Sequence, residues 1–259
     1  MPAKKEGISF VVKIRNEEAT LEKSIRSLFP LTIPHEIILV IHLCTDRSYE
    51  IALQLQKENP QIRIVGYENE ISRAGYENLA TDIFSQHSLA TYYNFCLAKC
   101  IYPWKFKWDA DFLATGPLIR FLNGKIWSAN ERGTYKLKAI SPESTSIEGY
   151  LSSTLVFYGK FAYWEVPVHA GKRNILTAPD DVHIIHDSML KTLKTYWLAK
   201  PWYLTEKSEE ADLVKSRIER LNTEFGKEPV GNARCCNNSA NIVCKKIMGA
   251  KLTYVNLEK

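Results

Sequence analysis

Two aspartates separated by one residue follow an apolar run of the chain and could do chemistry. Asp109 and Asp111 come directly after the run Trp-Lys-Phe-Lys-Trp at 104–108. Residues two apart in an extended segment point the same way, so the two carboxylates are expected side by side. Such a pair repels unless a proton or a cation bridges it, and oxygen ligands suit Mg²⁺ or Mn²⁺. The spacing indicates a divalent-cation site or a solvated loop, because Asp-x-Asp is a common pattern.

The elements that position these aspartates alternate between apolar runs and helical patterns. The predicted strands are Ile8–Ile14, Ile37–Ile41, Ile62–Tyr67 and Trp104–Trp108. Asn16 is expected to cap the first intervening helix, and Thr45 or Asp46 the second. This alternation predicts a right-handed, mostly parallel sheet with helices on both faces, a Rossmann-like α/β architecture. Ligands of such sheets bind beyond the carboxyl ends of the strands, where the aspartates fall.

The pattern changes after Phe121. Ile126–Ile140 and Tyr150–Val168 are predicted strands of a smaller, mixed region, and 188–225 is predicted to be helical. We expect residues 1–190 to form one α/β domain and residues 191–259 a helical extension packed on that domain.

Composition excludes several classes of protein. The 259 residues include 34 basic and 29 acidic side chains, a net charge of +5 without a clustered basic stripe, so a nucleic-acid partner is not expected. No run approaches the roughly 18 apolar residues of a membrane span, and the first residues lack an apolar signal region. We therefore expect a cytoplasmic protein without an integral membrane segment, which leaves room for peripheral membrane contact.

Three ordered segments resemble family 2 glycosyltransferases of the GT-A fold. The opening ISFVVKIRNEE at 8–18 resembles the first strand of these enzymes and the turn after it. The segment EIILVIHLCTD at 36–46 resembles the second strand of these enzymes and its turn into a helix. The segment KWDAD at 107–111 resembles their metal-binding Asp-x-Asp segment. The resemblance covers about residues 8 to 120. It implies transfer of a sugar from a nucleotide-diphosphate sugar, by default a UDP-sugar, to a hydroxyl of a glycan or another acceptor.

The same resemblance implies which residues contact the donor across the strand ends. They are Lys13, Ile14, Arg15, Glu17, His42, Arg73, Asn94, Asp109 and Ala110. His42 stands where the family usually has an Asp that binds uracil, so GDP and dTDP stay open, and a packed strand-end histidine is an equal alternative. Arg73 either binds the diphosphate with its planar fork or lies on the surface. For Asn94 a structural role is as well supported as a binding role.

For catalysis the resemblance implies a Mn²⁺ or Mg²⁺ ion held by Asp109, Asp111 and His186, which stabilises the nucleoside-diphosphate leaving group. His186 could instead cap a helix beside Asp187. Single displacement with inversion then needs a general base, for which Glu165, Asp181 and Asp187 are the candidates, Glu165 first. Relatives usually have Glu after the Val-His segment, where this chain has Ala170, and His169 is a further alternative.

Two other classes of protein compete with this interpretation. A sugar-phosphate nucleotidyltransferase would have a similar sheet, but it would open with a glycine-rich loop where this chain has Lys-Ile-Arg-Asn-Glu-Glu. A non-catalytic module that binds nucleotide sugars or carbohydrate would explain the missing uracil-binding Asp and the missing Glu. The intact Asp109-Ala110-Asp111 segment favours the enzyme.

Overall fold

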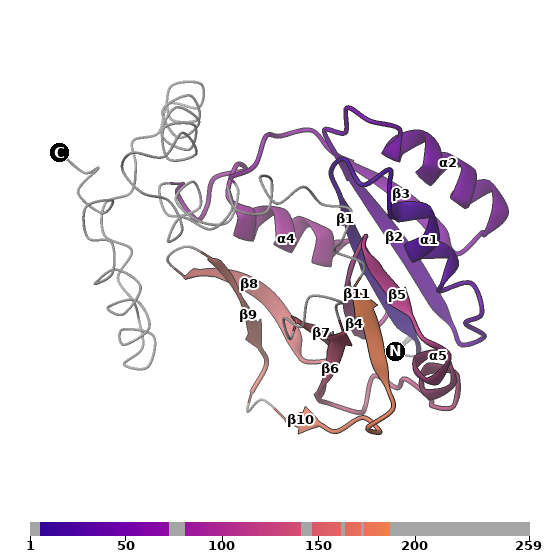
Figure 1. The fold of residues 1–259 in the computed structure, drawn as a ribbon. Coiled ribbons are helices and arrows are strands. Elements are labelled where there is room, and N and C mark those ends of the chain that lie inside the picture. The colour runs from indigo at the N-terminus through magenta and orange to yellow at the C-terminus, as the bar shows by residue number, and fades with distance from the viewer. Residues whose placement is uncertain (1–5, 73–80, 141–146, 162–163, 172–173, 187–259) are drawn as a thin grey trace, which may run out of the picture. The chain divides into compact units, whose positions relative to one another are not determined.

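The computed structural model describes residues 6–72, 81–140, 147–161, 164–171 and 174–186 (Figure 1). Strands and helices alternate up to residue 109, as the sequence predicts. The elements of this part are β1 (Ile8–Ile14), α1 (Leu21–Arg26), β2 (His35–His42), α2 (Ser48–Glu58), β3 (Ile62–Tyr67), α4 (Leu89–Ala98) and β4 (Trp104–Asp109).

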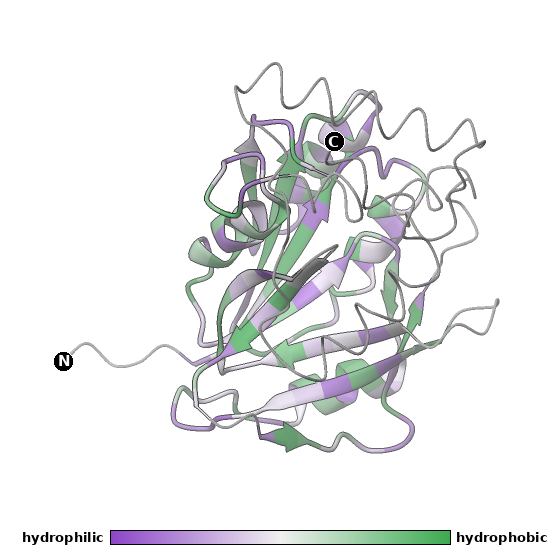
Figure 2. Cartoon of the chain, turned by 90° about the vertical axis from the view of Figure 1, so that its left-hand side faces the viewer, coloured by the Kyte–Doolittle hydropathy of each residue, from purple (hydrophilic) through white to green (hydrophobic). Residues whose placement is uncertain are grey.

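Four of these strands form a parallel arrangement in the order β3-β2-β1-β4. β1 and β2 are buried along almost their whole length, as expected where both faces of a sheet are covered, whereas β3 is partly exposed and β4 is buried at alternate residues. Figure 2 colours the strongly hydrophobic stretches of these strands green. Ile14 pairs with Ile41, and Lys13 pairs with Asp109. The carboxyl ends of β1, β2 and β4 therefore lie at one edge of the sheet.

The sheet as a whole is mixed, although its central strands are parallel as expected. In the described part of the chain it has nine strands. The later elements are β5 (Phe112–Ala114), α5 (Gly116–Asn123), β6 (Thr134–Ile140), β7 (Ile147–Ser152), β10 (Ile175–Leu176) and β11 (His183–His186). β7 runs antiparallel to both β4 and β6, and β5 runs antiparallel to β11.

The strand predicted at 126–140 begins only at Thr134. Trp127 explains the difference, because its side chain is buried in the core and its indole Nε1 donates a hydrogen bond to Leu122 O at 2.9 Å. That placement needs an irregular backbone between α5 and β6. The predicted run at 150–168 is divided among the end of β7 and two further strands, β8 (Leu155–Phe161) and β9 (Trp164–His169), which form a separate two-stranded sheet.

The chain divides into two compact units. The first comprises Met1–Asn69, Phe95–Phe157 and Val168–Leu190 and contains the nine-stranded sheet, whereas the second includes Glu70–Asn94 and Tyr158–Pro167. The predicted C-terminal helices lie outside the described residues. None of the helices in the described part of the chain has the length and apolarity that crossing a bilayer requires.

Aromatic side chains pack β4 against β1 and β5 in the first unit. Phe10 stacks on Phe106 with ring centroids 5.4 Å apart, and Trp108 meets Phe112 edge-on at 5.5 Å. Such pairs add about 0.5–1.5 kcal/mol each beyond the burial of their area. The carboxyl end of β4, where Asp109 lies, is therefore held by a well-packed core.

Candidate functional site

Asp109 ends β4 beside two ammonium groups. Its Oδ1 lies 3.8 Å from Lys13 Nζ, and its Oδ2 lies 3.4 Å from Lys107 Nζ. The side chain of Asp109 is 31% exposed, so solvent partly screens both ion pairs. Lys107 did not emerge from the sequence analysis, although its alternation with Phe106 and Trp108 places it on the face that carries Asp109.

Asp111 lies in a different environment from Asp109, because the chain turns at Ala110 and Asp111 instead of continuing extended. The two carboxylates therefore have separate partners, contrary to the side-by-side arrangement expected from an extended segment. Asp111 is 2% exposed, and its Oδ2 lies 3.2 Å from Nε2 of His186. His186 is brought there because β11 pairs with β5, which places His186 opposite Phe112.

Ser24 of α1 and Ser27, the residue that caps the end of this helix, hold the segment that carries the aspartates. Ser24 Oγ accepts a hydrogen bond from the indole Nε1 of Trp108 at 3.0 Å and donates to Asp109 O at 3.5 Å. Ser27 Oγ accepts from Ala114 N at 2.9 Å, after the turn. The sequence analysis missed both serines, although their spacing of three residues places them on one helix face.

The amino end of β11 is tied to the start of α5. Thr115 Oγ1 donates a hydrogen bond to His183 O at 2.7 Å and accepts one from Leu118 N, which caps α5. One threonine thus fixes the start of α5 against the strand that ends at His186.

The loops after β1 and β2 are joined by side chains. Asn16 has φ 57°, a left-handed conformation that Asn tolerates, and its Oδ1 accepts a hydrogen bond from Thr45 N at 2.8 Å. Asn16 therefore does not cap α1, which begins only at Leu21. This corrects the sequence expectation. Glu17 is held in the same junction, because its N donates to Ser48 Oγ at 2.7 Å.

The N-cap residue of α2 is Arg47 and not Thr45 or Asp46 as expected, but the side chain of Asp46 binds the first backbone N–H of the helix. Its Oδ1 accepts from Ser48 N at 2.9 Å, and its Oδ2 accepts from Glu18 N at 3.0 Å. Partial burial alone would raise the pKa of Asp46, but the hydrogen bonds from Ser48 and Glu18 outweigh it and hold the pKa below its ordinary value. Ile14 and Arg15 are two of the residues predicted to contact the nucleotide sugar. They lie at the carboxyl end of β1 beside this junction, where Ile14 is buried and Arg15 is half-buried.

His42 is buried at the end of β2, with 1% of its surface exposed. Its Nε2 lies 3.0 Å from Asn69 O, and its ring meets Tyr67 edge-on at 6.1 Å. These contacts match the packed strand-end histidine weighed as the alternative to base recognition.

Asn94 belongs to the second unit, where its amide is used for pairing with Tyr158. Its Nδ2 donates to Tyr158 O at 2.9 Å, and its Oδ1 accepts from Tyr158 N at 2.6 Å. Both hydrogen-bonding atoms of the side chain have a backbone partner. The geometry therefore favours the structural role for Asn94.

Several predicted site residues lie outside the described residues. They are Arg73, predicted to bind the diphosphate, and the candidate base Asp187. The backbone of the candidate base Glu165 belongs to β9, but its side chain is not described. Asp181 is exposed and precedes β11, whereas His186 ends that strand. The structure therefore places Asp181 and Asp111 toward opposite ends of β11.

His169 lies among buried hydroxyl groups. Its Nδ1 is 2.9 Å from Thr154 Oγ1 and 3.4 Å from Ser152 Oγ. Ser152 pairs with Lys105, four residues before Asp109 along β4, which corresponds to about 13 Å at the rise of a strand. His169 is therefore placed near the opposite end of β4 from the aspartates.

Asp111 and His186 fit a divalent cation by chemistry and spacing. Carboxylate oxygen and imidazole nitrogen are both ligands of Mn²⁺. Their 3.2 Å separation is close to the ~3.0 Å expected between neighbouring ligands of one octahedral ion. Nδ1 of His186 is buried, with no hydrogen-bond partner among the described residues. Because those residues hold no cluster of three His, Cys, Asp or Glu suited to a metal, other groups such as phosphate oxygens would complete the coordination.

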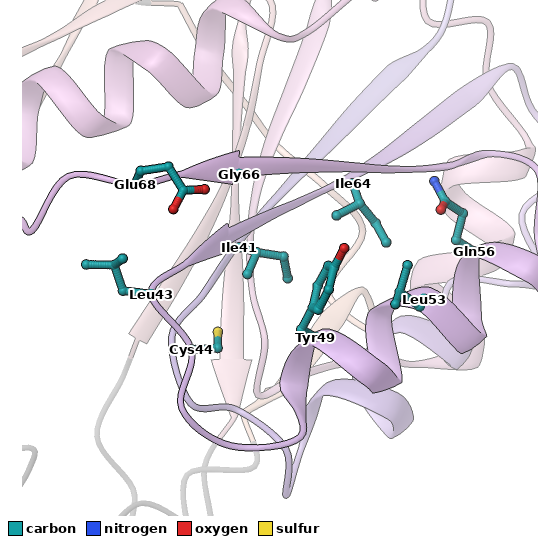
Figure 3. Close-up of a pocket in the computed structure, with 9 residues that line it drawn as sticks. All are labelled: Ile41, Leu43, Cys44, Tyr49, Leu53, Gln56, Ile64, Gly66 and Glu68. Carbon is teal, nitrogen blue, oxygen red and sulfur yellow. The ribbon is translucent and has the colours of Figure 1, made fainter.

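A separate hollow of about 720 Å³ lies on the α2 face of the sheet (Figure 3). Apolar side chains of β2, β3 and α2 form its walls, among them Ile41, Ile64 and Leu53, and Glu68 lies at its rim. Among the described residues, none of those predicted for the site lines it. The hollow is therefore not the candidate site at the carboxyl ends of the strands.

Comparison with known proteins supports the fold alone. The chain matches no protein-family model and no curated protein sequence. It resembles the crystal structure of S. aureus TarS 1–349, with a TM-score of 0.51 and 12% identity over 96% of this chain and 81% of that one. It also resembles the mannosyltransferase PcManGT from Pyrobaculum calidifontis, solved with GDP-Man and Mn²⁺, with a TM-score of 0.51 and 13% identity over 99% and 71% of the chains. The chain thus has the fold of solved glycosyltransferases, as the resemblance of its sequence predicts.

Proposed function

We propose that the protein is a divalent-cation-dependent glycosyltransferase that uses a nucleotide-diphosphate sugar, with a UDP-sugar as the first candidate. The observation that carries the proposal is the contact between Asp111 and His186. These side chains are 75 residues apart in the sequence, and the fold brings them together. The glycosyltransferase fold supports the same reaction, because PcManGT was solved with a nucleotide sugar and Mn²⁺.

In the proposed reaction an acceptor hydroxyl oxygen bonds to the anomeric carbon while the bond from that carbon to the diphosphate oxygen breaks. The nucleoside diphosphate leaves with the electron pair, the hydroxyl proton passes to a carboxylate base, and the anomeric configuration inverts. Glu165, Asp181 and Asp187 remain the proposed bases, Glu165 first.

The residues of the chain contribute charge and position to this reaction. Lys13 and Lys107 lie beside Asp109, so their ammonium groups can offset negative charge that grows on the diphosphate, while Asp109 binds the ribose or the cation. Asp111 and His186 would hold Mn²⁺ or Mg²⁺, which as a Lewis acid stabilises the leaving group when bound. Ser24 and Ser27 keep the turn between β4 and β5 in place.

A non-catalytic module that binds nucleotide sugars is the second candidate. The ion pairs of Asp109 with Lys13 and Lys107 and the packed His42 favour it, because both differ from the pattern implied by the resemblance. A panel of nucleotide sugars with Mn²⁺, followed for slow hydrolysis of the donor, separates the two because it needs no acceptor. The enzyme releases nucleoside diphosphate from one donor of the panel, whereas a binding module binds a donor and releases none.

A further inference from the structure

One face of the central strands is rich in lysine. Along β4 the burial pattern alternates, so Lys105 and Lys107 lie opposite the buried aromatic side chains. Along β6 the same alternation exposes Lys136 and Lys138. Tyr150 of β7 pairs with Lys107 on one side and with Lys136 on the other. The four lysines therefore share a face of three adjacent strands, and we call this set, with Tyr150, the lysine face.

The lysine face is reachable from solvent. The side chains of Lys107 and Lys136 are 33% and 39% exposed. Lys136 Nζ lies 3.0 Å from a carboxylate oxygen of Glu148 and 5.7 Å from the centroid of the Tyr150 ring. Tyr150 also donates a hydrogen bond to Glu148. The ammonium group of Lys136 thus lies over an aromatic ring on the surface of the sheet.

Positive charge exceeds negative charge on this part of the sheet. With Lys13 of β1 there are five lysines, against the carboxylates of Asp109 and Glu148. Lysines often protect the edge strands of sheets, but β4, β7 and β6 are internal strands, so that explanation does not apply. The lysines of β4 and β6 repel one another across the intervening strand β7, and a bound anion would offset this repulsion.

We propose that the lysine face binds an acceptor that carries phosphate groups, an inference that rests on the proposed glycosyl transfer. Lys136 and Lys138 lie on β6, two strands or about 10 Å to the side of β4, and the register places Lys136 level with Lys107. The strip from Lys107 to Lys138 thus begins at the proposed donor site and leads away from it. Ammonium groups act as point charges and suit tetrahedral phosphate, whereas planar carboxylates favour the fork of Arg, which this face lacks.

The test uses inorganic polyphosphate as the probe and the double variant Lys136→Gln/Lys138→Gln. Lys23→Gln/Lys57→Gln on α1 and α2 removes the same charge elsewhere and is the matched control. Removing two exposed charge contacts should weaken polyphosphate binding about tenfold in low salt, with less difference in high salt. The control pair should bind polyphosphate as the wild type does, and UDP affinity with Mn²⁺ should be unchanged in both variants.

Three results would overturn the inference. Equal weakening in both pairs would show a general charge effect, and unchanged binding in the Lys136/Lys138 pair would show that the lysine face does not bind phosphate. Polygalacturonate binding as tightly as polyphosphate would contradict the preference for phosphate. Failure of the wild type to bind UDP or any nucleotide sugar would instead overturn glycosyl transfer and the acceptor role with it, so the two proposals fail separately.

Discussion

The indole Nε1 of Trp108 donates a hydrogen bond to Ser24 Oγ at 3.0 Å, and both side chains are fully buried. The same hydroxyl donates to the backbone carbonyl of Asp109. One serine of α1 therefore links the last aromatic residue of β4 to the first aspartate of the site. This relationship places the site on the core rather than on a loop that could move independently of it.

Removing this hydroxyl should destabilise the protein. Ser24→Ala leaves the buried indole N–H of Trp108 without its acceptor, which should lower the free energy of unfolding by about 1–3 kcal/mol. Urea denaturation of Ser24→Ala, Trp108→Phe and the double variant measures the effect. We expect the double variant to lose less than the sum of the single variants, with a coupling of about 1 kcal/mol. Strict additivity would show that the bond contributes nothing.

His186 should matter for cation-dependent binding and not merely for the strand that carries it. His186→Gln removes the imidazole beside Asp111, and we expect UDP affinity in the presence of Mn²⁺ to fall about tenfold or more. His183→Gln on the same strand is the matched control and should retain the wild-type affinity. Equal affinity in the two variants, measured by calorimetry, would exclude His186 from the cation site.

The general base can be assigned by three isosteric variants. Glu165→Gln is expected to abolish transfer, whereas Asp181→Asn and Asp187→Asn should retain it, because a base must lie within hydrogen-bond reach of the acceptor hydroxyl. Release of nucleoside diphosphate in the presence of an acceptor is the measurement. Transfer that survives Glu165→Gln and stops in either Asp variant would reassign the base.

His35 should make the stability of the fold depend on pH. Its Nδ1 lies 2.8 Å from Ile33 O, and its ring is buried against Phe10. Burial lowers the pKa of His35 below the ordinary 6.5, so the unfolded chain takes up a proton before the folded one. The buried neutral ring therefore contributes its full share to the free energy of unfolding at pH values above 6.5. This contribution is lost as the pH falls from 6.5 through the lower pKa of the folded protein.

Urea midpoints between pH 7.5 and 5.5 measure this loss. The wild type and His183→Gln should lose stability as the pH falls, and His35→Gln should lose less. Parallel curves for all three proteins would show that another group causes the dependence.

The strands β1 and β2 could be predicted because their apolar runs are almost continuous, as burial on both faces requires, and β4 because its apolar residues alternate with lysines. The irregular segment around Trp127 could not, because its apolar residues have the composition of a strand and only the core that receives Trp127 reveals the difference. Asn16 has the side chain of a helix cap. Its actual partner, Thr45, is 29 residues away and is brought there by the pairing of β1 with β2.

The candidate site was predictable to a similar degree. The position of Asp109 and Asp111 after an apolar strand indicated the sheet edge, and the resemblance to glycosyltransferases suggested His186. The sequence spacing could not show that the chain turns at Ala110, which separates the environments of the two carboxylates. The role of Ser24 was also hidden, since its partner Trp108 is 84 residues away.

The central claim is that Asp111 takes part in holding a divalent cation against the diphosphate of a nucleotide sugar. Calorimetric titration of UDP with Mn²⁺ or with EDTA, on the wild type and Asp111→Asn, tests it most directly, with Asp180→Asn as the control on an exposed carboxylate. We predict cation-dependent binding in the wild type and Asp180→Asn and its loss in Asp111→Asn. Binding that ignores EDTA, or that persists equally in Asp111→Asn, would contradict the account.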